Sequence, residues 1–277
     1  MNRTYCIFIL SHERANKLYT YNMLINNGIE KKHIYIVVDD EDKQKNIYRQ
    51  KFKNVLIYNK DEIQKETDTV DSFYDLKKTG LFARNFIMKK AKELGYNYCI
   101  MLDDDYKHIK LKYICENKVK SKNINNLNVL FNMCIEYMDG CSQIDFISFC
   151  GEGDYFGGKE SMTFKRGLIR KAVNVFIFKS DCDIKFLGRI NDDICTNVLY
   201  QSKGRLFLSI GNIMLDMCKT MKIDGGMFDL YKQCGDYVKS FYPIIVNPSC
   251  TIISDNLYHK VYKNNCCPKI VSERYKK

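Results

Sequence analysis

Short apolar runs alternate with amphipathic stretches along the N-terminal part of the chain. Three runs of strand length, Tyr5–Leu10, Ile34–Val38 and Val55–Tyr58, consist mainly of aliphatic and aromatic residues. Helix-like segments separate them, and the first begins at Ser11 and ends at Gly28, where a glycine suits a C-terminal cap. Strands that alternate with helices in this way predict a parallel sheet covered by helices.

The stretch from Gly80 to Gly95 predicts a helix, because its apolar residues recur at helical spacing. A strand follows at once in YNYCIMLDDD and ends in three acids, Asp103, Asp104 and Asp105. Further predicted elements are a basic surface excursion over 107–128, helices at 129–138 and 192–202, strands at 146–149, 173–178 and 206–210, and an irregular tail from 225 onward.

The length and composition of the chain indicate which class of protein it belongs to. A chain of 277 residues with 45% hydrophobic content can bury the core of one large domain. No stretch resembles a membrane span or a signal peptide, so we expect a soluble, cytoplasmic protein without a membrane partner. The 13 cysteines are an odd number and lack the paired spacing of a zinc site or a disulfide framework, which predicts reduced and mostly buried thiols.

The formal net charge of +11 favours a polyanionic partner, because lysine and arginine displace counterions from phosphates. However, abundant Lys, Asn, Ile and Tyr beside only 3 prolines and no tryptophan are also typical of an AT-rich genome, whatever the function. The charge therefore permits binding to nucleic acid without establishing it. The oligomeric state stays open.

The three acids at the end of the predicted strand raise the question of a metal. If the strand stays extended, Asp103 and Asp105 project to one side and Asp104 to the other. Adjacent carboxylates raise each other's pKa unless a cation neutralises them, and Mg²⁺ or Mn²⁺ prefers oxygen ligands. The carboxyl ends of strands are where open α/β sheets bind ligands. A solvated turn with helix-capping aspartates is the alternative.

Four segments together resemble the GT-A class of nucleotide-sugar glycosyltransferases, whose D-x-D motif ends a central strand and holds a divalent ion on the donor diphosphate. They occur in the expected order as FILSHERANK, IYIVVDDED, GLFARNFIMKKAKELGYNYCIMLDDD and RINDDICTNVL. The helix with G-L-F-A-R-N, the NDD segment and the late NLYHKV are most similar to the TET/JBP-associated glycosyltransferases. That family is predicted to modify hydroxymethylated pyrimidines such as hydroxymethylcytosine in DNA, often in phages.

The resemblance implies an α/β, Rossmann-like GT-A fold with a mostly parallel central sheet, flanking helices and a smaller acceptor-side subregion. It implies one domain over 1–277, with a nucleotide-sugar-binding half at 1–106 and an acceptor-side half with a C-terminal tail at 107–277. It also implies Mn²⁺ or Mg²⁺ bound by Asp103, Asp105 and His259, the last a ligand that suits Mn²⁺ better.

The resemblance further implies a set of residues that bind the donor: Ser11, Arg14, Asp39, Asp40, Arg84 and Asp104. Ser11 and Arg14 stand at a predicted helix start, which favours anions, and Arg84 offers a fork of donors for a phosphate. Asp39 or Asp40 would accept hydrogen bonds from the base or ribose, with His12 as a further donor-loop group. The alternatives are helix caps for the acids and an ordinary surface ion pair for Arg84.

Asp192 and Asp193 are the candidate catalytic bases implied by the resemblance. They follow Asn191 at a predicted helix start, where the helix dipole keeps a carboxylate ionised and able to accept a proton. Structural capping acids are the alternative, and the stereochemical outcome is left open. For the acceptor, the segment GGKESMTFKRGLIRK and the excursion are two candidate surfaces with residues suited to phosphates: Lys165, Arg166 and Arg170, and Lys118, Lys120 and Lys122.

The resulting hypothesis is a metal-dependent glycosyltransferase that moves a sugar from a nucleotide-sugar, with a UDP-sugar favoured, to a hydroxymethylated pyrimidine in DNA. A target hydroxyl that is inaccessible within the duplex would require base extrusion or single-stranded substrate. A protein, glycan or small-molecule acceptor is the first alternative. A nucleotidyltransferase and a non-catalytic nucleic-acid-binding module are further alternatives.

Overall fold

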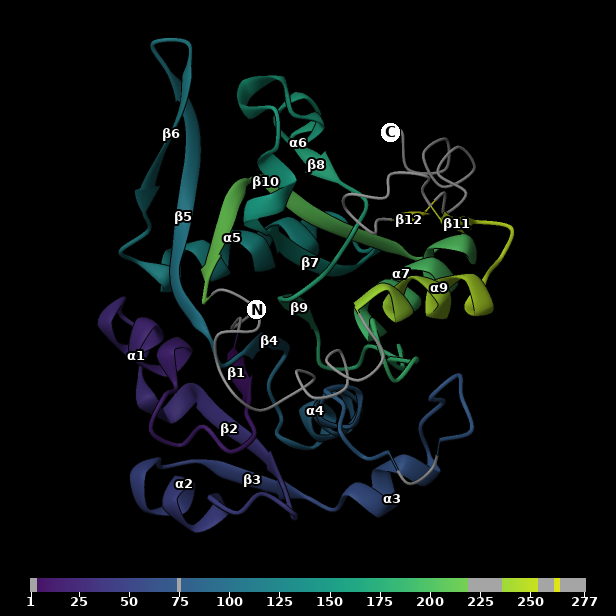
Figure 1. Cartoon of the computed structure of the whole chain (residues 1–277). Coiled ribbons are helices and arrows are strands. Elements are labelled where there is room, and N and C mark those ends of the chain that lie inside the picture. The colour runs from purple at the N-terminus through teal and green to yellow at the C-terminus, as the bar shows by residue number, and fades with distance from the viewer. Residues whose placement is uncertain (1–3, 74–75, 219–235, 254–261, 265–277) are drawn as a thin grey trace.

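The computed structural model describes residues 4–73, 76–218, 236–253 and 262–264 (Figure 1). Its strands are β1 (Tyr5–Leu10), β2 (Ile34–Asp39), β3 (Val55–Tyr58), β4 (Tyr98–Asp103), β5 (Tyr106–Cys115), β6 (Lys118–Asn123), β7 (Ile144–Cys150), β8 (Leu168–Ile169), β9 (Phe176–Lys179), β10 (Leu206–Met217), β11 (Thr251–Ile253) and β12 (Tyr262–Asn264). Its α-helices are α1 (Tyr19–Asn26), α2 (Lys45–Lys51), α3 (Lys60–Lys65), α4 (Leu81–Glu93), α5 (Leu127–Gly140), α6 (Met162–Arg166), α7 (Asp192–Ser202) and α9 (Phe241–Val246). Short 3₁₀ turns are η1 (Lys31–His33), η2 (Glu152–Tyr155), η3 (Gly158–Glu160) and η4 (Asp236–Ser240).

One large sheet runs through both predicted halves of the chain in the order β3-β2-β1-β4-β9-β7-β10-β5-β6, with β8 paired to β10. Strands β1, β2, β3, β4, β6, β7 and β10 run in one direction, and β5, β8 and β9 run against them. This confirms the predicted α/β architecture with a mostly parallel central sheet.

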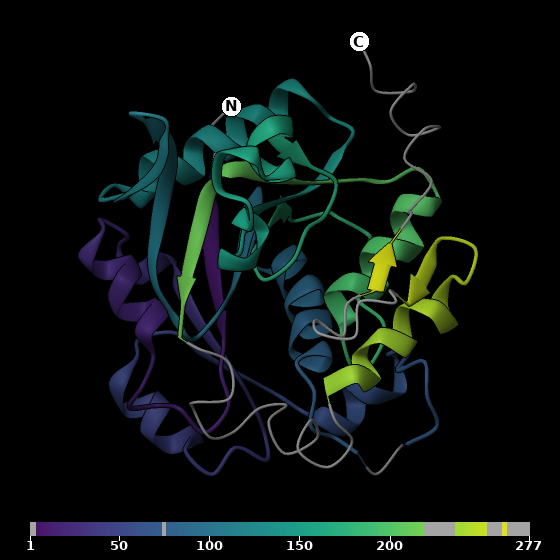
Figure 2. The ribbon, with the colours of Figure 1, turned by 45° about the horizontal axis from the view of Figure 1, so that its top comes forward.

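Helices cover both faces of the sheet, which explains why its strands are continuously apolar. Successive residues of β1 alternate between the two faces. Ile7 and Ile9 pack in one core cluster with α1 and α5, whereas Phe8 and Leu10 pack in a second cluster with α4. Figure 2 shows α1 and α4 on opposite sides of β1. The burial of both faces places the acid-tipped β4, the neighbour of β1, in the middle of the molecule.

Several predicted boundaries were wrong. The first helix begins at Tyr19, because the side chain of Ser11 and the backbone N–H of Arg14 hydrogen-bond to Tyr48 across a loop. The basic excursion forms an antiparallel hairpin of β5 and β6 that extends the sheet. The tail expected to be irregular includes η4, α9 and the small sheet β11-β12. Strand β4 ends at Asp103, so the extension needed to carry the acid alternation to Asp105 stops there.

The described ranges were also compared with the expectations for membrane spans and for cysteines. No helix there is both long and apolar enough to cross a membrane. All ten cysteines within those ranges are free thiols, and most are buried, as predicted. Cys266, Cys267 and His259 lie outside the described residues.

Candidate active site

Asp103 ends β4 and is held by groups from three elements. Its carboxylate accepts a hydrogen bond from Arg84 Nη2 on α4 at 3.2 Å and from the Tyr106 hydroxyl on β5 at 2.9 Å. The Thr20 hydroxyl on α1 donates to the Asp103 carbonyl at 2.6 Å and accepts from the Tyr106 N–H at 2.9 Å. These bonds fix the turn that follows β4, so the Asp103 side chain, 33% exposed, has a defined position.

Asp104 points into the protein, where its charge is matched. Its carboxylate accepts from Ser11 Oγ at 2.6 Å and from Arg14 Nη1 at 2.7 Å, and the residue is only 4% exposed. Tyr48 supports both donors, since its hydroxyl contacts Ser11 Oγ at 2.7 Å and accepts from the Arg14 N–H at 2.9 Å. Burial raises the pKa of Asp104, and Arg14 and Ser11 oppose that rise. Two predicted donor-binding residues therefore form an internal network with a third.

Arg14 also has a guanidinium N–H group that makes no hydrogen bond to the described residues. Its Nε is buried and has no hydrogen-bond partner within the part of the chain that the structure describes. The side chain remains 18% exposed. Arg14 can therefore hold Asp104 through Nη1 and still offer a second donor to an anion.

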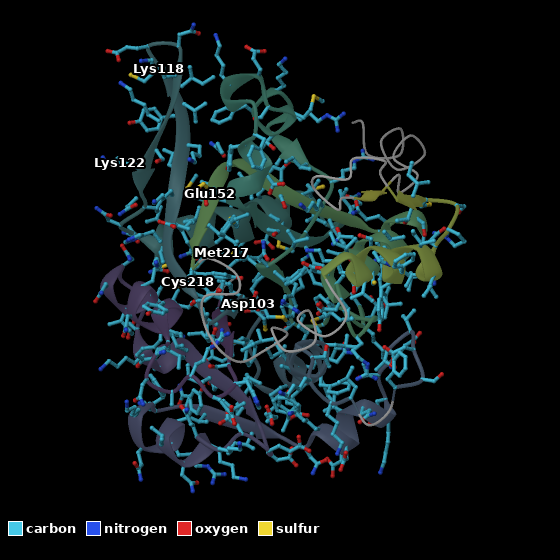
Figure 3. All side chains as sticks on the ribbon, in the orientation of Figure 1. Asp103, Lys118, Lys122, Glu152, Met217 and Cys218 are labelled. Carbon is cyan, nitrogen blue, oxygen red and sulfur yellow. The ribbon has the colours of Figure 1, made fainter. Side chains whose placement is uncertain are left out.

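Asp105 has surroundings unlike those of Asp104. Among the described residues, no other residue donates a hydrogen bond to its carboxylate, and its carbonyl accepts from the Cys218 N–H at 3.0 Å. Burial, together with the charges of Asp103 and Asp104, raises the pKa of Asp105 to about 7. Figure 3 shows Asp103 near Cys218 and Met217, at the end of β10. Uncompensated negative charge thus accumulates at this point.

The carboxylates of Asp103 and Asp105 fit a hard divalent cation in their chemistry. Within the described ranges, no group of three or more His, Cys, Asp or Glu side chains is arranged to hold a metal. Two carboxylates are enough for an ion such as Mg²⁺ when waters and substrate phosphates complete its shell. A cation there would also offset the charge that raises the pKa of Asp105.

Arg84 joins the end of β4 to the start of α7. Its Nη2 lies 3.2 Å from Asp103 Oδ1 and its Nε 2.8 Å from Asp192 Oδ2. The guanidinium also packs over the rings of Phe176 and Phe186, 5.1 Å and 5.7 Å from their centres. The Nε–Oδ2 pair is an ion pair without hydrogen-bond geometry, so both atoms lack a hydrogen-bond partner in the described part. At 7% exposure Arg84 is a buried bridge and not a surface ion pair.

Asp192 and Asp193 begin α7 and face different neighbours. Burial raises the pKa of both, that of Asp192 to about 6, while Arg84 works in the opposite direction. Asp193 Oδ1 accepts from the Ile194 N–H at 2.7 Å, and the positive charge of Lys171 acts on Asp193. Asp192 therefore contacts Arg84 directly, whereas the positive charges of both Arg84 and Lys171 act on Asp193.

Asp39 ends β2, Asp40 follows it, and the two acids have different contacts. Asp39 contacts His12 Nδ1 at 2.6 Å and Lys60 Nζ at 3.0 Å. Burial alone would raise the pKa of Asp39, but the hydrogen bonds from His12 and Lys60 outweigh it and lower the pKa to about 2. Asp40 accepts from Asn59 Nδ2 at 2.9 Å and from the Lys60 N–H at 3.1 Å, so it anchors the start of α3. The donor-binding roles of both acids stay predictions.

The three predicted acceptor residues lie on α6 and just after β8. Lys165 and Arg166 are exposed on α6, and Lys165 Nζ pairs with Glu160 at 2.8 Å. Arg170 is partly buried, and its carbonyl accepts from Gln201 Nε2 at 3.2 Å. The acceptor role of these three residues stays a prediction.

Sequence reasoning missed several residues that shape the site: Thr20, Asp42, Tyr48, Lys60 and Tyr106. Asp42 is fully buried and accepts the N–H groups of Glu13 and Gln44, at 2.8 Å and 2.6 Å, which folds the loop after β1. None of them belongs to a motif of its own. Only the acid run at positions 39–42 could have drawn attention to Asp42, and the others act across long sequence separations.

Residues 5–226 match the family described as TET-Associated Glycosyltransferase. The chain belongs to this family. The match includes the acids of β4, Arg84 and the start of α7, so it covers the elements that form the site. The predicted resemblance to this family of glycosyltransferases is confirmed. No curated protein matches the sequence.

Solved structures with a similar chain path include the following two proteins. S. aureus TarS 1–349 in complex with UDP-GlcNAc is 13% identical, with 87% of this chain and 72% of that chain covered at a TM-score of 0.42. In another TarS 1–349 crystal structure, the chain spans only 59% of that chain's length. Glucosyl-3-phosphoglycerate synthase from Mycobacterium tuberculosis, with Mn²⁺, UDP and phosphoglyceric acid, is 7% identical, with 97% and 92% covered at 0.48.

Proposed function

We propose that this TET-associated glycosyltransferase transfers a sugar from a UDP-sugar to the hydroxyl group of a hydroxymethylated pyrimidine in DNA, with Mn²⁺ or Mg²⁺ as cofactor. The observation that carries the proposal is the position of Arg84. One buried guanidinium contacts both Asp103 at the end of β4 and Asp192 at the start of α7. It therefore supports a single centre in which the donor-side acids and the acceptor-side acids work together.

On the donor side, the diphosphate would lie against Asp103 and Asp105, and the nucleoside would lie toward Asp39. Asp103 and Asp105 would hold the cation, and His259 stays a candidate ligand. When bound, the cation supplies positive charge that stabilises the departing diphosphate. Arg14 Nε, buried and without a partner among the described residues, would donate to a phosphate oxygen.

On the acceptor side, Asp193 would take the proton from the attacking hydroxyl. Its raised pKa brings it closer to the working pH of a general base, and Lys171 on the acceptor-side segment acts on it. Asp192, which faces Arg84, would hold that arginine in place as a positioning residue. Lys165, Arg166 and Arg170 would contact phosphates of the acceptor strand.

The DNA acceptor is supported by the family and by the formal net charge of +11. The test incubates purified protein and Mn²⁺ with labelled UDP-sugars and either hydroxymethylated DNA, unmodified DNA or a panel of glycans. We expect label on the hydroxymethylated DNA alone. Label on glycans alone would overturn the DNA acceptor and leave the glycosyltransferase.

Matched variants test the assignment of the base. Asp193→Asn should lower kcat by about a thousandfold while KM for the donor stays within a few-fold, because the lost proton acceptor acts only in the reaction. Asp192→Asn should retain more activity and change the metal dependence through Arg84. If Asp192→Asn shows the larger kcat loss, the two roles are exchanged and our assignment is wrong.

A further inference from the structure

The hairpin of β5 and β6 has two faces with different environments. Lys112 and Ile114 share the face that turns toward η2 and η3, where Lys112 Nζ lies 5.2 Å from the centre of the Tyr155 ring. Val119 is on the same face and lies against Gly158. This face of the hairpin is therefore partly covered by protein, at Lys112 and Val119, while Ile114 stays 52% exposed.

The opposite face carries a row of lysines beside apolar and aromatic groups, and we call it the lysine face. The antiparallel register pairs Lys122 with Leu111, Lys120 with Tyr113 and Lys118 with Cys115, and residues directly opposite each other share a face. Side chains at every second position are about 7 Å apart along a strand. The edge strand β6 therefore holds three lysines in a regular row, of which Lys120 is paired with Glu116 at 2.9 Å.

The lysine face is accessible to a ligand from solvent. Leu111 and Tyr113 are 36% and 38% exposed, and Lys118 and Lys122 are exposed. Strand β5 pairs with β10 only as far as Leu111, so the tip of the hairpin projects beyond the sheet (Figure 1). Figure 3 shows Lys118 near that tip and Lys122 further down the same edge.

A pocket continues this face at the base of the hairpin. It has a volume of about 360 Å³ and lies between α1 and the two ends of the hairpin, at Lys107–Ile109 and Asn123–Asn125. It shares no lining residue with the acids of β4 and α7. Ile109, on the same side of β5 as Leu111, packs in the core cluster that includes α1 residues, so the pocket opens at the end of the lysine row.

The chemistry of the pocket suits a nucleobase. Its lining combines apolar surface with Tyr19 and the amides of five asparagines: Asn22, Asn26, Asn27, Asn123 and Asn125. In the described part of the chain, only Asn27 among these five uses its side-chain amide in a hydrogen bond within the protein. A base has flat apolar faces and polar edges, and amide side chains can pair with those edges.

We propose that the lysine face and the asparagine pocket together bind a single polynucleotide strand, with the phosphates along Lys118, Lys120 and Lys122 and a base in the pocket. Tyr113 offers a ring on which another base stacks. A strand with regularly repeating negative charge and accessible bases matches both features, whereas an acidic peptide would match only the lysines. The inference rests on the proposed function in so far as DNA is the acceptor, and it adds a binding site outside the acid cluster.

The first test measures binding of a fluorescent single-stranded DNA oligonucleotide by the whole protein at several salt concentrations. The double variant Lys118→Gln/Lys122→Gln should bind about tenfold more weakly and lower the slope of log affinity against log salt by about 1.4, twice the single-strand value per phosphate. The matched control is Lys31→Gln/Lys53→Gln, which removes the same charge from exposed sites near β2 and β3, at the opposite edge of the sheet. The control should bind like wild type.

The second test separates bases from phosphates by comparing that oligonucleotide with an abasic one of equal length. Wild type should prefer the oligonucleotide with bases by about tenfold or more, and Tyr113→Ala and Asn123→Leu should each reduce the preference without changing the salt slope. The melting temperature of each variant confirms folding. Equal affinity of wild type for both oligonucleotides would overturn the pocket and stacking assignments.

The outcomes distinguish this inference from the proposed function. If the two double variants bind alike, or if poly-glutamate of equal charge competes as well as DNA, the inference is wrong even if the enzyme glycosylates DNA. If the hairpin variants lose DNA binding while only glycans accept sugar, the inference stands and the proposed acceptor is wrong.

Discussion

Asp104 and Asp105 are adjacent acids with opposite surroundings. Asp104 is buried against Ser11 and Arg14, which supply hydrogen bonds and positive charge. Asp105 has no such donors among the described residues, and its pKa is raised to about 7. The same side chain is thus a structural anchor at one position and an uncompensated charge at the next.

The contrast between Asp104 and Asp105 distinguishes an acid that stabilises the fold from an acid that can bind a ligand. An acid whose carboxylate is already paired with cationic and hydrogen-bonding groups of the protein stabilises the fold. Few of its oxygen lone pairs remain for a ligand. An acid that is buried without compensation costs stability, and a protein keeps such a group where a ligand can offset the cost. Asp103 lies between the two cases, because Arg84 and Tyr106 hold it while its side chain stays 33% exposed.

The largest expected effect comes from Asp105→Asn. We expect kcat/KM to fall by about a thousandfold, because half of the proposed cation site is lost. The free energy of unfolding of the metal-free protein should stay the same or rise, since the variant no longer buries an uncompensated charge. Steady-state kinetics with Mn²⁺ and calorimetry of UDP binding with and without the ion measure the first effect.

The control for that experiment is Asp104→Asn. It should lower the free energy of unfolding by about 2 kcal/mol, because Arg14 is left partly buried without its counter-ion. If Asp104→Asn abolishes ion-dependent UDP binding and Asp105→Asn does not, the contrast between the two acids is reversed.

Arg84→Met should lower the free energy of unfolding by about 3 kcal/mol. The change leaves Asp103 and Asp192 close together without the cation that bridges them. Denaturant unfolding measures the loss, and the double variant Arg84→Met/Asp192→Asn should recover part of it. A double variant no more stable than the single one would mean that Arg84 acts mainly through its packing on Phe176 and Phe186.

Asp39→Asn should lower stability at pH 7 by about 2 kcal/mol, since the native pKa of about 2 lies below the usual 3.8. Because the pKa is lowered, this contribution is present above about pH 4 and is lost as the pH falls toward 2. The variant should therefore lose less stability than wild type over that acid range in thermal melts. Asp61→Asn is the control, because its pair with Lys77 is at the surface. An Asp61→Asn profile that matches that of Asp39→Asn would remove the special role of Asp39.

The smallest effects are expected from Ser11→Ala and Tyr106→Phe. Each removes one hydroxyl donor to a carboxylate, of Asp104 and Asp103 respectively, and each should cost about 1 kcal/mol of stability. Only Tyr106→Phe should also change the Mn²⁺ concentration needed for half-maximal activity. A metal dependence shifted by Ser11→Ala instead would place the cation nearer Asp104.

Parts of the fold were predictable because their signal is local. The strand Tyr5–Leu10 was predicted with its observed bounds, and the helix that ends at Gly95 was predicted within one or two residues. Both follow from apolar spacing and a terminal glycine. The hairpin of β5 and β6 was missed, because an edge of a sheet can be polar and basic and then resembles a loop.

The candidate site also has a part that local sequence patterns predict and a part that they do not. The acid run at 103–105 and the acid pair at 192–193 are visible in the sequence, but the link between them is not. Arg84 contacts both Asp103 and Asp192, although it is distant from both in the sequence. Lys60, on α3, likewise contacts Asp39 at the end of β2. Such contacts depend on how helices pack on the sheet, and no local pattern encodes that packing.

The sequence by itself determined the alternation of strands and helices, the acids at the strand end and the family, because these depend on short-range order along the chain. Only the tertiary structure decided which acid is neutralised inside the protein and which is exposed to a ligand. The reason is that the energy of a charge depends on burial and on the nearest groups of opposite sign, and those groups come from distant parts of the chain.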